Sequence, residues 1–363
     1  MAERKQDKRL QEMRDKGVKI YSISKLNTID QCKHQAYLSY IKKIPREKRN
    51  KGIYGIMGSE VHDAIEAFCH NEVDLKHIEE SIEKEMDMMD LLGISFPKDR
   101  NGNYSIRDNW LSNMFRFSKE FKLPTEYPDQ KLTIATEKLL LYKIDDDHCM
   151  MGYADAIRKN DDGTVTLIDW KTSANFTKKK LIEAGRQLVL YKLALEDMGY
   201  KVRECQWCML KYCETSWKLK NGKTKTKVSE WRNLIKDLSK QIEKSLYDLG
   251  YSEADVESFM LDGLEKNSWD PFPEEIKNKY NTHVYYRTYE ITDDIINETL
   301  EYLNSRINDF ETCKEWTPCD IDKNSFFCCN LCDFGGQTGL CKHYVDYLNS
   351  FQKEESDEIA DLF

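Results

Sequence analysis

Two charged residues near the middle of the chain have the types and the spacing to assist hydrolysis of a phosphodiester. Asp169 and Lys171 stand two residues apart, so they face the same side if this segment is a β-strand. Apolar residues surround them in the sequence LIDWKT (167–172), which predicts that both charges border a core. Charges in such a position are costly to the fold unless they bind something.

The preceding segment brings another carboxylate to the same place. Asp155, in the sequence GYAD, belongs to a run that would form a hairpin with the strand of Asp169. A loop over 161–163 pairs Asp155 directly with Asp169, and a loop over 159–163 makes the two diagonal neighbours. Both registers keep the carboxylates on one face of the sheet, whereas a four-residue loop would separate them.

Two carboxylates and an ammonium group on one face suit a hydrolase that uses Mg²⁺ or Mn²⁺. The carboxylates would hold the cation, which polarises a phosphate and lowers the pKa of a bound water. The ammonium group of Lys171 would orient that water or stabilise developing negative charge. An Asp–Lys pair on the solvated face of a strand is the alternative that stays open at this point.

A histidine and a glutamate upstream of the hairpin could complete this site. His62 is expected one turn inside a helix that starts at Gly58, where an imidazole can reach a metal ion. A lone histidine is more often structural, and that alternative also stays open. Glu137, on the strand before Asp155, is a candidate for an acid that supports the metal ligands.

The helix predicted after the lysine strand offers an amide and a phenol. Gln187 and Tyr191 are four residues apart, so they lie on one face of that helix. Groups of this kind can hold a backbone phosphate or brace Lys171 in position. A polar seam between packed elements is the alternative interpretation.

The hydrophobic pattern predicts the elements that must position these residues. Several segments have apolar residues at the spacing of a helix. Short β-branched or aromatic runs, separated by DDD and NDDG turns, predict an antiparallel meander. We find no repeat and no Gly/Ser- or Pro-rich linker, which favours one elaborated α/β domain over two. We expect strands at 132–144, 148–159, 164–172 and 201–212, and helices at 58–92, 105–121, 179–199, 229–249 and from the capping residue Thr292.

The composition of the 363-residue chain limits its function class. A hydrophobic share of 40% and a charged share of 33% are typical of a globular protein. The N-terminus lacks a secretory signal, and no run approaches the roughly 20 apolar residues of a membrane span, so we expect a cytoplasmic protein without a membrane partner. The net charge of −9 opposes general attraction to nucleic acid but allows local basic tracks, found at 42–51, 178–180 and 218–227. Solvated loops are the alternative for each track.

Twelve cysteines in such a chain need a reason other than disulfides, because reducing compartments keep thiols reduced. Cys329-x₂-Cys332-x₈-Cys341 is a metal-binding pattern that lacks one ligand, and Cys328 adjoins it too closely to join Cys329 as a regular pair. Ligand type alone leaves zinc and an iron–sulfur cluster as alternatives. The cysteines at 205–213 are better explained as buried thiols of a β-rich segment.

The order of these motifs resembles the RecB-like branch of the PD-(D/E)xK nucleases. That branch includes the nuclease domains of AddB-type helicase–nucleases and the CRISPR-associated RecB-like exonucleases. The resemblance implies a restriction-endonuclease-like α/β core, a central mixed sheet flanked by helices with helical insertions. The motifs that carry it are S-x-S-x-L at 22–26, Cys32, Tyr37, G-x-x-x-H at 58–62, G-x-x-D at 152–155, D-x-K at 169–171, Q-x-x-x-Y at 187–191 and the terminal cysteines.

The resemblance also implies a role for each candidate residue. Asp169 stands where many relatives carry Glu, a departure that D-x-K variants of the superfamily tolerate. The iron–sulfur relatives take their fourth cysteine from the N-terminal end of the domain, which implies a 4Fe–4S cluster on Cys32, Cys329, Cys332 and Cys341. The implied metal ligands are His62, Asp155, Asp169 and the backbone carbonyl of Trp170, with Lys171 positioning the water and Gln187 and Tyr191 in support.

We therefore expect a metal-dependent DNA nuclease, an exonuclease that processes single strands or DNA ends in replication, recombination or repair. The expected organisation is a charged arm at 1–20, one nuclease domain at 21–345 and an acidic tail at 346–363. Within the domain, the catalytic core spans about 58–215 and an insertion spans about 216–290. A non-catalytic DNA- or partner-binding subunit and a zinc-bound version of the domain are the alternatives. The residues expected to contact DNA are Lys42, Lys43, Arg46, Lys178, Lys179 and Lys180.

The last ten residues, EESDEIADLF, combine five acids with an apolar tip. Such a segment has too little apolar surface to fold alone, so we predict a disordered tail. Leu362 and Phe363 resemble the end of the short motif by which bacterial proteins dock on the sliding clamp, and the acidic run resembles the tip of single-stranded-DNA-binding proteins. A sliding clamp or another replication protein is the expected partner, and a solubilising tail is the alternative.

Overall fold

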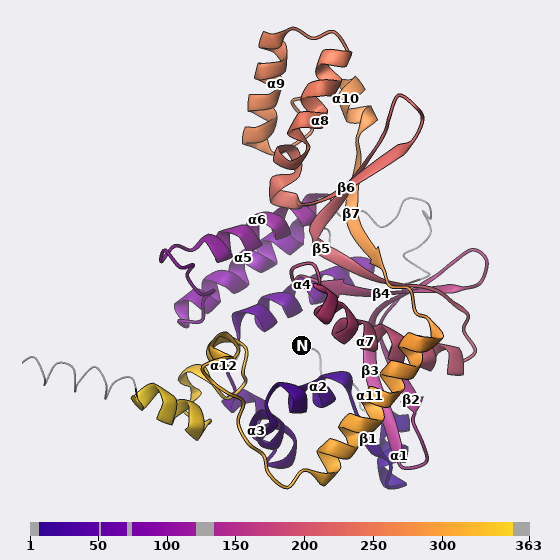
Figure 1. The fold of residues 1–363 in the computed structure, drawn as a ribbon, viewed down its shortest axis with the longest axis vertical. Helices are drawn as coiled ribbons and strands as arrows, with labels where there is room; N and C mark the ends of the chain where they lie inside the picture. The colour runs from indigo at the N-terminus through magenta and orange to yellow at the C-terminus, as the bar shows by residue number, and fades with distance from the viewer. Residues whose placement is uncertain (1–6, 51, 71–74, 121–133, 351–363) are drawn as a thin grey trace, which may run out of the picture.

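The computed structural model of the chain describes residues 7–50, 52–70, 75–120 and 134–350 (Figure 1). A seven-stranded mixed sheet forms its centre and carries helices on both faces. The predicted fold class, an α/β core with a central mixed sheet flanked by helices, is confirmed. Within the described ranges, no helix is long and apolar enough to cross a membrane.

The sheet is mixed because parallel and antiparallel pairs alternate across it. Its order is β1-β3-β4-β5-β6, with β2 paired to β3 and β7 paired to β5. The β1/β3 and β4/β5 pairs are parallel, and the others are antiparallel, so β2, β3 and β4 form the predicted meander. The strands are β1 (Lys19–Tyr21), β2 (Ile134–Lys143), β3 (His148–Lys159), β4 (Val165–Lys171), β5 (Val202–Lys218), β6 (Thr224–Glu230) and β7 (Asn281–Thr288).

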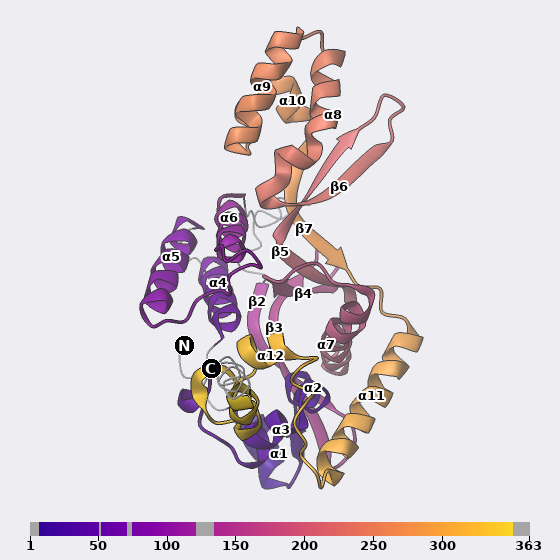
Figure 2. The same ribbon diagram turned by 60° about the vertical axis from the view of Figure 1, so that its left-hand side comes forward.

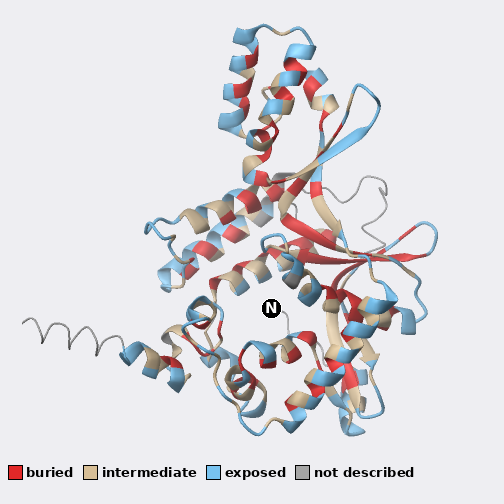
Figure 3. Ribbon diagram, viewed as in Figure 1, coloured by how far each residue is buried: buried red, intermediate tan, exposed pale blue. Residues whose placement is uncertain are grey.

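Both faces of β4 are covered, because its alternating side chains enter two different cores. Ile168 and Trp170 pack with α4 (Ile53–Cys69), α5 (Leu75–Leu91) and α6 (Ser105–Glu120), whereas Leu167 packs with α2 (Ile23–Gln31), α7 (Lys178–Asp197) and α11 (Asp293–Thr312). Figure 3 shows the buried positions along the strands and on the inward faces of these helices. The other α-helices of the described residues include α1 (Lys8–Asp15), α3 (Lys33–Ala36), α8 (Leu234–Asp248), α9 (Glu253–Lys266), α10 (Glu274–Lys279) and α12 (Ser325–Asn330).

Two helix boundaries follow the chemistry that the sequence predicts. Gly199, two residues after α7 ends, has a φ of +86°, a left-handed conformation that favours glycine and stops the helix. Thr292 caps α11, since its hydroxyl accepts a hydrogen bond of 3.4 Å from the backbone N–H of Ile295. The residue types at these two positions therefore correctly predict the end of α7 and the start of α11.

Other boundaries differ from the prediction. The helix predicted at 58–92 is two helices, α4 and α5, and α4 begins at Ile53, so Gly58 lies inside it rather than at its start. The apolar period continues on both sides of the break, which is why periodicity alone predicts one helix. The strand predicted at 201–212 extends to Lys218. The helix predicted at 229–249 begins at Leu234, after a 3₁₀ turn.

The described residues of the N-terminal segment pack against the rest of the chain. In the described part of the predicted arm, α1 buries Leu10 and Lys19–Tyr21 joins the sheet beside β3. Residues 351–363, which contain the predicted docking tip, lie outside the described residues. The N-terminal segment is therefore part of the folded unit rather than an appendage to it.

The predicted insertion, residues 216–290, forms a lobe that extends from one end of the sheet (Figures 1 and 2). The lobe contains α8, α9, α10 and the hairpin of β5 and β6, and its buried side chains include Trp231, Leu238 and Phe272. β7 returns from the lobe and pairs with both halves of β5. This insertion lobe therefore shares its longest strand with the catalytic sheet.

Candidate active site

The hairpin of β3 and β4 brings the two predicted carboxylates together. The strands pair with Ala156 opposite Ile168, and a turn over 161–163 connects them. Extending this register by one residue sets Asp155 opposite Asp169, which is the first of the two registers derived from the sequence. Both side chains therefore belong to one face of the sheet.

The carboxylates are buried and only partly satisfied. Asp155 is 9% exposed and its Oδ2 accepts a hydrogen bond of 2.8 Å from the backbone N–H of Trp170. Asp169 is 2% exposed and its Oδ2 lies 2.6 Å from Nζ of Lys171. Apart from this ion pair, Asp169 Oδ2 has no hydrogen-bond partner within the described part of the chain. An oxygen left in that state is suited to accept a cation.

His62 approaches the same carboxylates from α4. Its Nδ1 lies 3.7 Å from Asp155 Oδ2, and its ring packs edge-on to the Trp170 indole with centroids 5.8 Å apart. Burial and the Lys171 charge lower the pKa of His62, whereas Asp169 and a hydrogen bond with the Trp170 backbone raise it by less. The imidazole is therefore held neutral, the form that binds metal ions.

Gln187 and Tyr191 lie on one face of α7, as their spacing predicts. Gln187 Nε2 donates a hydrogen bond of 2.9 Å to the Tyr191 hydroxyl, so the two side chains act as one unit. Tyr191 lies directly against Gly152 of β3, where any side chain larger than hydrogen would collide with its ring. This close approach explains the glycine in the sequence GYAD.

The pocket holds more acidic groups than its one lysine could neutralise if all of them were ionised. Burial raises the pKa of Asp155, and the Asp169 charge raises it further, against smaller opposing effects of Lys171 and the Trp170 N–H. Burial lowers the pKa of Lys171, but the two aspartates outweigh it and the net shift is upward. The lysine is therefore cationic, and Asp155 still favours a proton or a metal ion beside it.

Glu137 adds a further acid from β2. The β2/β3 register sets Glu137 opposite Asp155, and its charge contributes to the raised pKa of that residue. Its φ is +47°, a conformation that is uncommon for a residue other than glycine. Such backbone strain is concentrated at functional sites, where the surrounding fold sustains it.

These residues fit a hard divalent cation. The donors present are carboxylate oxygens and a neutral imidazole, and Lys171 is the one partner of the buried Asp169 Oδ2 among the described residues. Within the described ranges, no three His, Cys, Asp or Glu side chains are arranged as a preformed metal site. Mg²⁺ is usually held by one or two carboxylates and keeps several waters, so Asp155 and Asp169 suffice for it.

A cavity of about 470 Å³ is lined by Asp155, Glu137, Gln187 and Tyr191 of the candidate site. Arg46, which the sequence analysis assigns to DNA contact, lines this cavity. Ser22 and Ser24 of the first quoted motif also line it, together with Asn27, which the sequence analysis missed because a lone asparagine carries no spacing signal. Two of the candidate acids, Asp155 and Glu137, therefore face a polar cavity with one arginine at its wall.

The other basic residues assigned to DNA contact lie on the surface. Lys42 and Lys43 are exposed after the short helical segment at 37–41, and Lys178 and Lys180 are exposed in the first turn of α7. The side chain of Lys179 lies outside the described part.

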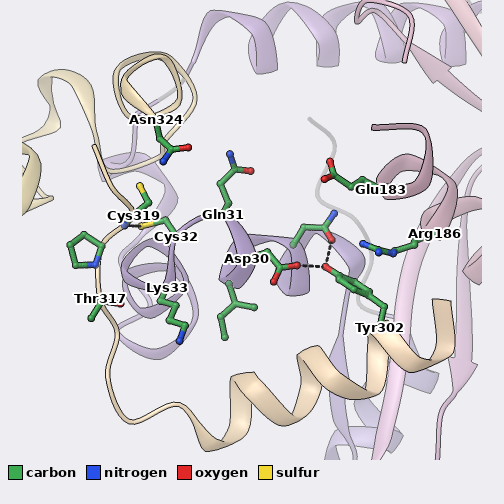
Figure 4. A pocket seen from close by; sticks show the side chains of 13 residues that line it. Asp30, Gln31, Cys32, Lys33, Glu183, Arg186, Tyr302, Thr317, Cys319 and Asn324 are labelled. Atoms are coloured by element: carbon green, nitrogen blue, oxygen red, sulfur yellow. Dashed lines mark hydrogen bonds between the residues drawn. The ribbon is translucent and has the colours of Figure 1, made fainter. Parts of the chain in front are cut away.

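A second polar cavity, of about 600 Å³, adjoins the first, since Asn27 lines both (Figure 4). On one side of it, the Arg186 guanidinium lies 3.6 Å from the centroid of the Tyr302 ring. On the other side lie Cys32 and Cys319, and the backbone N–H of Cys319 donates a hydrogen bond of 3.4 Å to the Cys32 thiol. This cavity therefore connects the catalytic pocket to the cysteine region.

The cysteine region brings the two ends of the domain into contact. Cys332 packs with Leu38 and Phe334 in a small core of its own. Arg49 forms an ion pair of 3.3 Å with Asp333 across that junction. Burial first, and then the Cys32 thiol among other causes, raise the pKa of Cys332 to about 12. Thiols gathered in this way suit a thiophilic metal centre, which binds them as thiolates.

The structure separates Cys328 from Cys329 and adds Cys319 to the group. The Cys328 thiol is buried and lies 3.6 Å from the thiol of Cys319, whereas Cys329 is exposed and lies 2.8 Å from the Tyr344 hydroxyl. After burial, the charge of Cys32 contributes to the raised pKa of Cys328, Cys332 and Cys341, and that of Cys341 contributes to the raised pKa of Cys328 and Cys332. The sequence gives no spacing signal for Cys319, which only the fold brings here.

A comparison with protein families agrees with this geometry. The family model described as the PD-(D/E)XK nuclease superfamily matches residues 20–336, which include every residue of the catalytic pocket. The chain matches no curated protein. The match covers most of the chain, from β1 into the cysteine region. The chain therefore belongs to the PD-(D/E)XK nuclease superfamily.

Proposed function

We propose that the chain is a metal-dependent deoxyribonuclease, an exonuclease that processes DNA ends. One observation carries this proposal: Asp155, Asp169 and Lys171 meet in one buried pocket whose acids exceed its lysine. Membership of a nuclease superfamily supports the reaction class. A site of this composition fits hydrolysis of an anionic ester better than a purely structural ion pair, because isolated buried charges are costly.

The metal would be Mg²⁺ or Mn²⁺, held by Asp155, Asp169, His62 and the Trp170 carbonyl. When bound, it polarises the phosphate and lowers the pKa of a coordinated water. The ammonium group of Lys171 orients the attacking water and stabilises the negative charge that develops on the phosphate oxygens. The water oxygen joins phosphorus, the bond to the leaving oxygen breaks, and that oxygen takes up a proton.

The remaining residues of the pocket would hold the substrate. Gln187 and Tyr191, joined by their hydrogen bond, position Lys171 or a neighbouring phosphate. Arg46 contacts the DNA backbone from the cavity wall. The exposed lysines of the basic tracks at 42–51 and 178–180 add contacts further from the site. Binding of this kind depends on salt and is largely independent of sequence.

The cysteine region is proposed to hold a structural 4Fe–4S cluster on Cys32, Cys329, Cys332 and Cys341. The chemistry of the thiols supports a metal centre, and zinc is the competing occupant. The burial of Cys328 makes it the alternative to Cys329 as third ligand from the C-terminal group. An iron–sulfur protein purified without oxygen would be brown, whereas a zinc protein would be colourless.

The acidic tail is proposed to recruit the chain to a replication partner such as a sliding clamp. Leu362 and Phe363 would enter an apolar pocket, with ordering entropy limiting the affinity to about micromolar. Deleting residues 359–363 should abolish clamp binding and leave cleavage of naked DNA unchanged. Equal clamp binding by both proteins would remove this part of the proposal.

The test of the nuclease is incubation with end-labelled single- and double-stranded DNA. Cleavage is expected with Mg²⁺ or Mn²⁺ and none with EDTA, and progressive shortening from one end would identify an exonuclease and its polarity. A closed circular substrate serves as the matched control, because an exonuclease leaves it intact. Binding without cleavage under every metal condition would instead favour a non-catalytic DNA-binding subunit.

A further inference from the structure

A lysine-rich cavity in the insertion lobe lies outside the catalytic pocket. It has a volume of about 500 Å³, in the range of roughly 300–1,000 Å³ that ligand sites occupy. Two buried aromatic residues, Trp217 and Tyr280, line it. The charged residues of its wall are five lysines and one acid: Lys218, Lys220, Lys225, Lys244, Lys279 and Asp248.

The positive charge of this cavity is largely uncompensated. Lys220 pairs with Asp248 at 3.1 Å, whereas the other four lysines have no carboxylate within ion-pair distance among the described residues. Hydrogen bonding to Lys220 lowers the pKa of Asp248, and the charges of Lys244 and Lys279 contribute to the same effect. One carboxylate thus faces several cations, in a chain whose net charge is −9.

One lysine of the cavity is held in place. Lys279 Nζ donates a hydrogen bond of 2.7 Å to Ser245 Oγ, which in turn contacts the Tyr280 hydroxyl at 2.8 Å. A fixed ammonium group loses less entropy on binding an anion than a free one does. The hydrogen bond to Ser245 therefore preorganises the Lys279 ammonium group in the cavity.

Helix ends explain part of this charge but not the rest. Lys279 ends α10, where cations are favoured by the helix dipole, whereas Lys244 precedes the last turn of α8. Lys218 and Lys225 come from the hairpin of β5 and β6, where no helix end requires them. The hairpin lysines thus point to an anion outside the protein.

We propose that this cavity binds the phosphodiester backbone of a nucleic-acid strand. The proposal rests on the proposed nuclease function and adds a second contact to the same substrate. Several lysines around one cavity suit successive phosphates, and point charges on flexible stems bind them without reading sequence. Trp217 and Tyr280 are buried, so we expect no contact in this cavity that distinguishes one base from another.

The distance of the cavity from Lys171 predicts how loss of its lysines would change KM and kcat. Lys171 pairs with Met209 of β5, and Lys218 stands nine residues further along the same strand. At about 3.4 Å per residue, Lys218 lies about 30 Å further along this strand than Met209, so we expect the lysines to contact DNA away from the scissile bond. Loss of such a contact weakens the ground and transition states equally, which raises KM and leaves kcat unchanged.

The test is a triple variant that removes three positive charges, K218Q/K225Q/K244Q, compared with wild type and with a control variant of equal charge loss, K201Q/K236Q/K266Q. All six lysines are exposed, and the control set lies outside the cavity lining. Binding of a labelled single-stranded 20-mer is measured by fluorescence anisotropy in EDTA over a series of salt concentrations. Each phosphate contact contributes about −0.7 to the slope of log K against log salt, so the cavity variant should lose about 2 from the slope magnitude.

Two further measurements make the outcome decisive. D248N removes the competing carboxylate and should tighten binding, and the cavity variant should raise KM for cleavage at unchanged kcat. Equal slopes for the cavity and control variants, with unchanged affinity of D248N, would overturn the cavity as a DNA contact even if wild type cleaves DNA. Failure of the nuclease proposal looks different, since wild type would then not cleave in any metal.

Discussion

Asp155 is buried beside a second carboxylate, and this has a measurable consequence for stability. Burial and the Asp169 charge raise the pKa of Asp155 from its ordinary value near 4 to about 8. In metal-free protein the native state therefore holds a proton that the unfolded chain has already released. Stability must fall as the pH rises through this raised value.

We predict that metal-free protein loses about 1.4 kcal/mol of unfolding free energy between about pH 7 and pH 9 through this residue. Asp155→Asn should flatten that dependence, because the amide does not titrate. Saturating Mg²⁺ should flatten it in wild type, since the cation replaces the proton. Denaturant titrations at several pH values measure the effect, and an identical slope in wild type and Asp155→Asn would contradict it.

Asp169 and Lys171 form one ion pair, but we expect their substitutions to differ. Asp169→Ala should mainly lose metal affinity, because it removes a ligand oxygen. Lys171→Ala should retain metal binding and lower kcat by about 10²–10³-fold, the usual effect of deleting one group that stabilises transition-state charge. Calorimetric metal titration and single-turnover cleavage separate the two, with circular dichroism as the folding control. Wild-type rates in either variant would remove the assignment of the site.

At the scale of elements, the contact of β3 with α7 positions Gln187 and Tyr191 at the candidate site. Gly152 allows the Tyr191 ring to lie directly on the strand, and Tyr191 in turn holds Gln187. Gly152→Ala should displace α7 from the sheet and cost about 1–3 kcal/mol, as overpacking typically does. Gly163→Ala is a useful comparison, because its added methyl meets no neighbour and only its φ of +79° is strained. Loss of cleavage only for Gly152→Ala, at similar stability, would tie the contact to catalysis.

The sequence predicts the elements that local chemistry determines. The hairpin register follows from a turn of strong turn formers between two alternating strands, and the face shared by Gln187 and Tyr191 follows from helical spacing. The break between α4 and α5 does not follow, because the apolar period crosses it. The strained backbone of Glu137 is equally invisible, since only the neighbouring strands impose it.

At the scale of the whole molecule, the cysteine region joins segments almost three hundred residues apart. Cys32 meets Cys319 through a hydrogen bond, and Arg49 meets Asp333 through an ion pair. Arg49 also donates hydrogen bonds to the backbone carbonyls of Ser39 and Ile44, so this member of a basic track is structural. Pattern analysis of cysteine spacing cannot find such long-range partners.

We predict that Cys32→Ala loses the iron, from about four atoms per chain toward none, and melts at lower temperature. Cys328→Ala and Cys329→Ala, compared under the same anaerobic purification, identify which of the two neighbours is a ligand. Cys205→Ala is the control, because that thiol is buried in the second core away from this region. Full iron content in Cys32→Ala would reassign the N-terminal ligand, and zinc in place of iron would support the competing metal.

The long strand β5 decides what can be removed from this protein. β7, the last strand of the insertion lobe, pairs with Gln206–Met209, the same stretch that pairs with Asp169 and Lys171 on its other edge. Excising residues 216–290 would leave that stretch as an open sheet edge with unpaired N–H and C=O groups next to the catalytic residues. Such an edge is a template for strand addition by another chain, so a shortened enzyme should self-associate rather than fold as a smaller nuclease.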